Sequence, residues 1–128
     1  MQTQHAVVWL DHRQARIFLF DRDHAESVKL STGKQFDQVH KHAGTLGGGR
    51  HEADTAFLNG IVKALQPAVE WLFVGPGSAK DELAKHVKSH HHNDAARIIG
   101  VESADHPTDG EIVALARKFF KAADRLLP

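Results

Sequence analysis

Cysteine is absent from all 128 residues of the sequence. Its absence excludes disulfide bridges, catalysis by a thiol and zinc sites built from cysteine thiolates. A chain without disulfides is compatible with a reducing compartment, and we expect the protein to be cytoplasmic.

A net charge is lacking as well, because 16 Lys and Arg residues balance 16 Asp and Glu residues. The chain therefore has no overall signature of a polyanion-binding protein, and contact with nucleic acid would have to come from a local patch.

No apolar run approaches the ~18 residues of a membrane span. Residues 1–4 lead into a strand pattern without the basic and apolar regions of a secretion signal. We expect no membrane association, and one domain spanning residues 1–128.

The spacing of apolar residues predicts the order of the elements. Three strands and a loop come first, followed by a helix, a strand, a helix, a strand and a last helix. The patterns predict strands over 5–10, 15–20, 27–30, 69–74 and 95–101, and helices over 52–65, about 79–90 and from 109 onward. The runs at 69–74 and 95–101 are typical of buried parallel strands. A meander followed by crossover units predicts an α/β fold, a ribonuclease H-like mixed five-stranded sheet with helices on its faces.

Polar residues mark the predicted helix starts. Ser78 with Asp81, and Thr108 with Glu111, have the spacing of N-terminal caps. Trp9 and Trp71 lie inside strand patterns and are predicted to be core residues.

The most unusual segment is glycine-rich, with a basic and histidine-rich approach: His40-Lys41-His42-Ala43-Gly44-Thr45-Leu46-Gly47-Gly48-Gly49-Arg50-His51. Consecutive glycines allow close approach by another molecule, and ordering them costs conformational entropy. We expect a long, mobile, cationic loop over about 35–49. It is either a solvated surface loop or an element that contacts phosphate-rich RNA.

Three segments in order resemble the middle domain of the archaeal and eukaryotic class 1 peptide-chain release factors and of the Pelota proteins. They also resemble the small bacterial proteins often labelled translational machinery proteins. These segments are Val7–Phe20, His40–Arg50 running into the following helix, and Trp71–Leu83. The resemblance implies a single domain of that kind, facing the ribosome or tRNA.

The resemblance stops at one position. In the release factors a glutamine follows two glycines and is central to peptidyl-tRNA hydrolysis, whereas here Arg50 follows Gly48 and Gly49. The resemblance therefore implies a binding module with no catalytic residue and no cofactor. The residues expected to contact RNA are Lys41, His42, Gly47, Gly48, Gly49, Arg50 and His51.

Histidines form two groups that could bind a metal: His40, His42 and His51, and then His86, His90, His91 and His92. His86 and His90 face the same side of a helix, as two imidazoles on one ion would. No HExxH or CxxC pattern accompanies them, so we take surface histidines with adventitious nickel or zinc binding as the default.

Two other functions stay open. One is an enzyme, either a metal-dependent nuclease or an esterase on the same fold. The nuclease would need several carboxylates that converge on Asp11, at the end of the first predicted strand. Its partners would come from Asp21, Asp23, Glu52 and Asp109. Asp11 more simply caps its own hairpin turn. A protein-interaction domain would use an exposed sheet edge, with a protein partner or a second copy as a homodimer.

Overall fold

The computed structural model describes residues 3–21, 24–32 and 47–125, and for 47–54 and 123–125 it describes the backbone. Five strands form one mixed sheet in the order β3-β2-β1-β4-β5. The strands are β1 (Thr3–Leu10), β2 (Gln14–Phe20), β3 (Ala25–Ser31), β4 (Ala68–Gly75) and β5 (Ile98–Ser103). This confirms the ribonuclease H-like α/β prediction.

The first hairpin is fixed by the turn between β1 and β2. One carboxylate oxygen of Asp11 accepts hydrogen bonds from the backbone N–H groups of Arg13 (2.8 Å) and Gln14 (2.9 Å). An Asx-type turn of this kind sets the register of the strands that it joins. Trp9 accordingly pairs with Arg16 across the ladder. The turn-capping role predicted for Asp11 is confirmed.

The centre of the sheet is the parallel pair β1 and β4, in which Val8 lies opposite Phe73. Both strands are buried on both faces, as their nearly continuous apolar sequence indicates. The last strand differs from the prediction. Residues 92–97 form a short 3₁₀ helix, η1 (His92–Arg97), and β5 begins only at Ile98. The strand itself is confirmed over 98–101, but β5 is an edge strand and is half-exposed, so the predicted start at 95 and the predicted burial are wrong.

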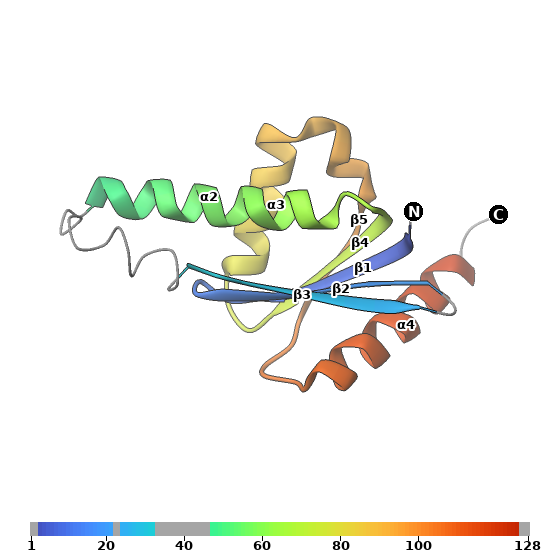
Figure 1. The fold of residues 1–128 in the computed structure, drawn as a ribbon. Helices are drawn as coiled ribbons and strands as arrows, with labels where there is room; N and C mark the ends of the chain where they lie inside the picture. The colour runs from blue at the N-terminus through green and yellow to red at the C-terminus, as the bar shows by residue number, and fades with distance from the viewer. Residues whose placement is uncertain (1–2, 22–23, 33–46, 126–128) are drawn as a thin grey trace.

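Helices cover both faces of the sheet (Figure 1). Helices α2 (Gly47–Leu65) and α3 (Ala79–His90) lie on one face, and α4 (Asp109–Arg125) lies on the other. Alternate residues of the strands feed two cores. The α2/α3 core includes Trp71, and the α4 core includes Trp9; both tryptophans are fully buried, as predicted. In the described residues no helix is long and apolar enough to cross a membrane.

The two predicted helix caps have different outcomes. At the start of α4 the backbone N–H of Thr108 donates to Glu111 (2.8 Å), and the backbone N–H of Glu111 donates to the Thr108 hydroxyl (3.2 Å). This reciprocal pair is a complete capping box. Ser78 makes no such bond at the start of α3. Its hydroxyl instead donates to the Glu82 side chain at 3.0 Å. Ser78 therefore occupies the predicted N-cap position of α3, with Asp81 in the first turn, but it makes no capping hydrogen bond.

The start of α2 also lies earlier than predicted. The helix begins at Gly47 rather than at residue 52, so Gly47–Gly49 are helical, not part of a loop. Each helical glycine costs roughly 0.5–1 kcal/mol relative to alanine, but extending an existing helix by a residue costs far less than starting one. The rest of the predicted mobile loop, residues 35–46, lies outside the described residues.

Candidate functional site

The predicted RNA-contacting residues gather at the start of α2. Gly47, Gly48, Gly49, Arg50 and His51 occupy its first turns, and Lys41 and His42 lie outside the described residues. Among the described residues of α2, side chains buried in the core begin at Phe57. Gly47 is ten residues earlier, which at 1.5 Å per residue is ~15 Å along the helix. Figure 1 shows this end of α2 extending beyond the turn end of the β1–β2 hairpin.

The chemistry of this helix start favours anions. The first backbone N–H groups of a helix have no partner within the helix, and the helix dipole adds a partial positive charge there. The first turn of α2 contains no acidic residue that would offset this charge. Glycine has no side chain to cover its N–H group, so a phosphate can approach closely. The structure therefore brings five of the seven predicted site residues to an end of α2 suited to phosphate.

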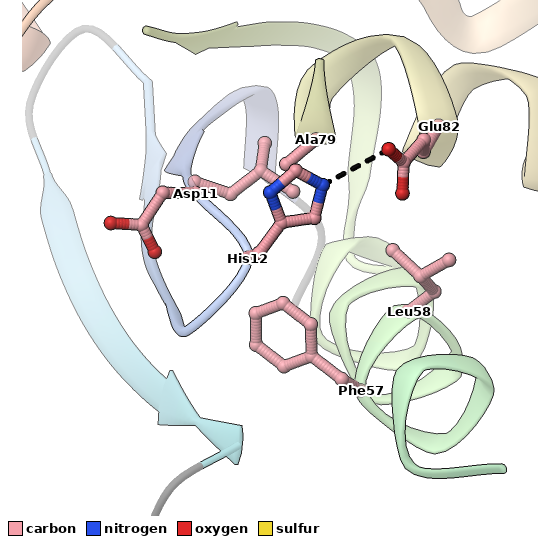
Figure 2. A pocket seen from close by; sticks show the side chains of 7 residues that line it. Asp11, His12, Phe57, Leu58, Ala79 and Glu82 are labelled. Carbon is pink, nitrogen blue, oxygen red and sulfur yellow. Dashed lines mark hydrogen bonds and ion pairs between the residues drawn. The ribbon is translucent and has the colours of Figure 1, made fainter. Parts of the chain in front are cut away.

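A small pocket lies where the middle of α2 passes the β1–β2 turn and the start of α3. Its lining residues include Leu10, Asp11, His12, Phe57 and Glu82, and Figure 2 shows how they are arranged. The space is about 10 Å³, which is room for about one water molecule. The pocket is too small to enclose an organic substrate.

The pocket does contain a polar chain that sequence reasoning missed. His12 Nε2 lies 3.0 Å from Glu82 Oε2, and the Ser78 hydroxyl donates to that same oxygen at 3.0 Å. The hydrogen bond from His12 is the largest of the effects that hold the pKa of Glu82 below its usual value. Because serine and histidine both bond to the carboxylate, the histidine does not activate the serine. Here the carboxylate lies between the serine and the histidine, whereas in a nucleophile–base–acid triad the histidine lies between the other two.

Of the acids considered for a nuclease, Asp23 falls outside the described residues, and for Glu52 the backbone alone is described. The other three are not brought together. Asp11 caps the turn after β1, while Asp21 lies at the far end of the same hairpin, where it accepts a bond from the His24 backbone (2.8 Å). Asp109 lies on the α4 side and pairs with Arg16 at 2.8 Å. Two-metal chemistry needs carboxylates around one point. The arrangement of these three acids does not supply that.

A wider groove of about 600 Å³ lies at the other end of the β1–β2 hairpin, beside α4. Its lining residues are Gln4, His5, Phe20, Asp21, Arg117, Phe120 and Lys121. The faces of the aromatic rings there are largely covered by neighbouring side chains. His5 stacks on Phe120 with 4.0 Å between centroids, and the Arg117 guanidinium covers Phe20 at 5.0 Å. Arg117, Lys118 and Lys121 are all exposed on α4, and Arg117 also packs on Phe20.

The histidines divide between the described and undescribed parts of the chain. His40 and His42 fall outside the described residues, and for His51 the backbone alone is described. His86, His90 and His91 do lie together at the end of α3. The ring centroid of His86 is 4.8 Å from that of His90 and 5.3 Å from that of His91.

The comparison with solved structures shows which known proteins share this fold. No protein-family model and no curated protein sequence matches this chain. Among solved structures, Pelota of Thermoplasma acidophilum superposes on 85% of this chain with a TM-score of 0.59 and 21% identity. Pelota of Archaeoglobus fulgidus covers 92% with a TM-score of 0.61 and 10% identity.

A third similar structure is Dom34 of S. cerevisiae, described as a translation termination-like factor involved in RNA quality control pathways. It covers 78% of this chain, with a TM-score of 0.51 and 14% identity. The chain spans about a third of the length of each of these proteins: 30%, 32% and 29%. At these identities the similarity establishes a shared fold.

Proposed function

We propose that this chain is a translation-related, ribosome- or tRNA-facing binding module, and that the start of α2 makes the contact. The observation that carries the proposal is the position of Gly47–Arg50 at the projecting end of a helix, in a fold shared with Pelota proteins. The projecting helix end can enter a confined RNA site while the sheet stays outside it.

Charge and backbone geometry support RNA as the ligand. The formal net charge of the whole chain is +0, so long-range attraction is weak and contact depends on local groups. The α2 start offers backbone N–H donors that have no partner within the helix, with Arg50 in the same turn and Lys41 nearby in sequence. Phosphate contacts of this kind fix position and orientation and carry no base specificity. The module should therefore recognise a folded RNA or ribosomal surface rather than a base sequence.

The proposal is tested by co-sedimentation of the purified protein with ribosomes at low salt. The double variant Lys41→Ala, Arg50→Ala should reduce the bound fraction strongly. The matched control, Lys118→Ala with Lys121→Ala, removes the same charge from the exposed face of α4 and should reduce it much less. Circular dichroism checks that both variants are folded.

Two results would contradict the proposal. Equal losses from the two double variants would indicate diffuse surface charge, and no binding to ribosomes or tRNA at low salt would remove the RNA ligand altogether. In the second case a protein-interaction role remains. The assignment of residues 1–128 to one such domain, working in the cytoplasm, belongs to the same proposal.

A further inference from the structure

The two edges of the sheet differ in regularity. At the β5 edge the pairing with β4 is irregular, and Ile99 is passed over between Ile98 and Gly100. Irregularities of this kind bend an edge and hinder pairing with a further strand. At the β3 edge all seven residues of the strand pair with β2 in one unbroken register, and none of them is proline. β3 is therefore the edge that a further strand can join.

The ends of the β2–β3 ladder show which backbone groups of β3 point outward. The N–H of Thr32 donates to the Arg13 carbonyl (2.9 Å), and the N–H of Asp21 donates to the His24 carbonyl (3.0 Å). Hydrogen-bonded pairs alternate along an antiparallel ladder, so the even-numbered residues of β3 bond to β2. The backbone groups of the odd-numbered residues point outward, where no described strand pairs with them: Ala25, Ser27, Lys29 and Ser31.

The side chains of β3 divide between the two faces of the sheet. Leu30 packs against the α2/α3 core, so Glu26 and Val28 lie on that face as well. Lys29 lies on the opposite face, where its Nζ is 3.8 Å from the Asp109 carboxylate. Val28 is 36% exposed and is one of three large apolar side chains exposed in the described residues. A β-branched side chain at the middle of an edge strand suits contact with the same residue type on a neighbouring strand.

We propose that β3 pairs antiparallel with β3 of a second copy of this chain, about a two-fold axis at Val28. An axis normal to the sheet keeps each side chain on its own face, as a continuous sheet requires. The two Val28 residues then form a non-hydrogen-bonded pair with Cα atoms ~4.5 Å apart. On either side Ser27 lies opposite Lys29 of the second copy, and these residues exchange backbone hydrogen bonds through their outward groups.

Overlap and charge single out this register, which pairs all seven residues of each β3. An axis at Lys29 would place two lysines directly opposite each other, which is destabilising. An axis at Ser27 would leave Leu30 and Ser31 opposite no residue of β3. With the axis at Val28, Glu26 lies opposite Leu30 and no like charges are opposed, so the strand is complementary to itself.

The first test is the association of the purified protein, measured by sedimentation equilibrium over a range of concentrations. Two paired strands of seven residues make a small interface, so the dimer should dissociate on dilution. Val28→Lys should weaken the dimer at least tenfold, because two ammonium groups would face each other at the axis. The matched control is Val69→Lys, which changes a 42% exposed valine on β4 and should leave association unchanged.

The second test uses a single cysteine, since the chain has none of its own. Val28→Cys should give a disulfide-linked dimer on mild oxidation, because its two Cα atoms would lie within the range that a disulfide spans. Ser27→Cys is the control. Its two Cα atoms would be roughly 8 Å apart in this register, which is too far for a disulfide.

Three results would overturn the proposal. A monomer at every concentration up to the solubility limit would exclude the dimer. Equal weakening by Val28→Lys and Val69→Lys would place the contact elsewhere, and faster cross-linking of Ser27→Cys than of Val28→Cys would exclude the register. The pairing involves no residue of α2, so it is independent of RNA binding.

Discussion

Gly75 and Leu10 make the closest backbone approach among the described glycines. A Cβ atom placed on Gly75 would lie 2.2 Å from the carbonyl oxygen of Leu10. The two residues end the parallel strands β4 and β1, beside the pocket that contains His12. The backbone carbonyl of Gly75 also accepts a bond from the Ala104 N–H (3.0 Å), which positions the chain leaving β5. This end of the sheet therefore requires glycine.

We predict that Gly75→Ala destabilises the fold by about 2–4 kcal/mol, because the strands must separate to admit the methyl group. Gly77→Ala is the matched control, since nothing lies within 4 Å of its Cβ position. At that position the substitution should be neutral or should stabilise the fold by up to about 1 kcal/mol, because alanine lowers the conformational entropy of the unfolded chain. Urea denaturation measures both. Similar losses from the two variants would contradict the packing argument.

The capping box at α4 gives a second contrast. Thr108→Ala removes a hydroxyl that caps the helix and should cost about 1 kcal/mol of unfolding free energy. Ser78→Ala removes a hydroxyl whose bond goes to an exposed side chain rather than to the helix backbone. We expect it to cost less than about 0.5 kcal/mol. A larger loss from Ser78→Ala than from Thr108→Ala would show that the Ser78–Glu82 bond matters more than its exposure suggests.

Local patterns predicted most of the fold because the elements follow local rules. The Asp11 turn, the apolar run of β4 and the Thr108 cap each depend on residues within a few positions of one another. The burial predicted for the strand over 95–101 was wrong because burial depends on the position of a strand in the sheet. An apolar run does not reveal that β5 is an edge strand.

The candidate sites were predicted less completely, for a related reason. The glycines, Arg50 and His51 were identified from composition, although their helical conformation was not. His12 and Glu82 are separated by 70 residues. Such a pair exists through tertiary packing, and no spacing rule in the sequence connects its members.

Glu82 gives a prediction on pH. Its pKa is lowered in the folded state, first by the hydrogen bond from His12, so the unfolded chain binds a proton more readily. The stabilisation is therefore present above the ordinary glutamate pKa of 4.5 and is lost as the pH falls through the lower pKa of the folded state. Glu82→Gln keeps an acceptor for His12 and should flatten the loss of stability below that pH.

The comparison uses urea denaturation at a series of acidic pH values. Glu26→Gln, on the exposed edge strand β3, is the control and should leave the slope close to that of the unchanged protein. A direct titration of the Glu82 carboxyl carbon by NMR should give a midpoint below 4.5. A midpoint above that value would show that the His12 bond does not persist in solution.

Arg50 gives a prediction on chemistry. The sequence resemblance to release factors implies that Arg50 stands where those proteins have a glutamine after two glycines. We expect the purified protein not to release peptide from peptidyl-tRNA on ribosomes at a rate typical of release factors. Arg50→Gln tests whether the position is equivalent, and a gain of release would show that it is. Robust release by the unchanged protein would show that backbone donors alone suffice.

The last prediction concerns the salt dependence of RNA binding. Each cation that neutralises a phosphate releases counterions, so the affinity falls with salt on a logarithmic scale. If Lys41 and Arg50 each meet one phosphate, removing both should flatten the slope of log affinity against log salt by roughly 1.5–2 units. Removing Lys118 and Lys121 should leave the slope nearly unchanged.

Binding should also strengthen as the pH falls from about 7.5 to 6, because histidines near the glycines in sequence, such as His42 and His51, gain positive charge. Filter binding with tRNA over a range of salt and pH measures both effects, and a slope that both double variants change equally would place the contact elsewhere.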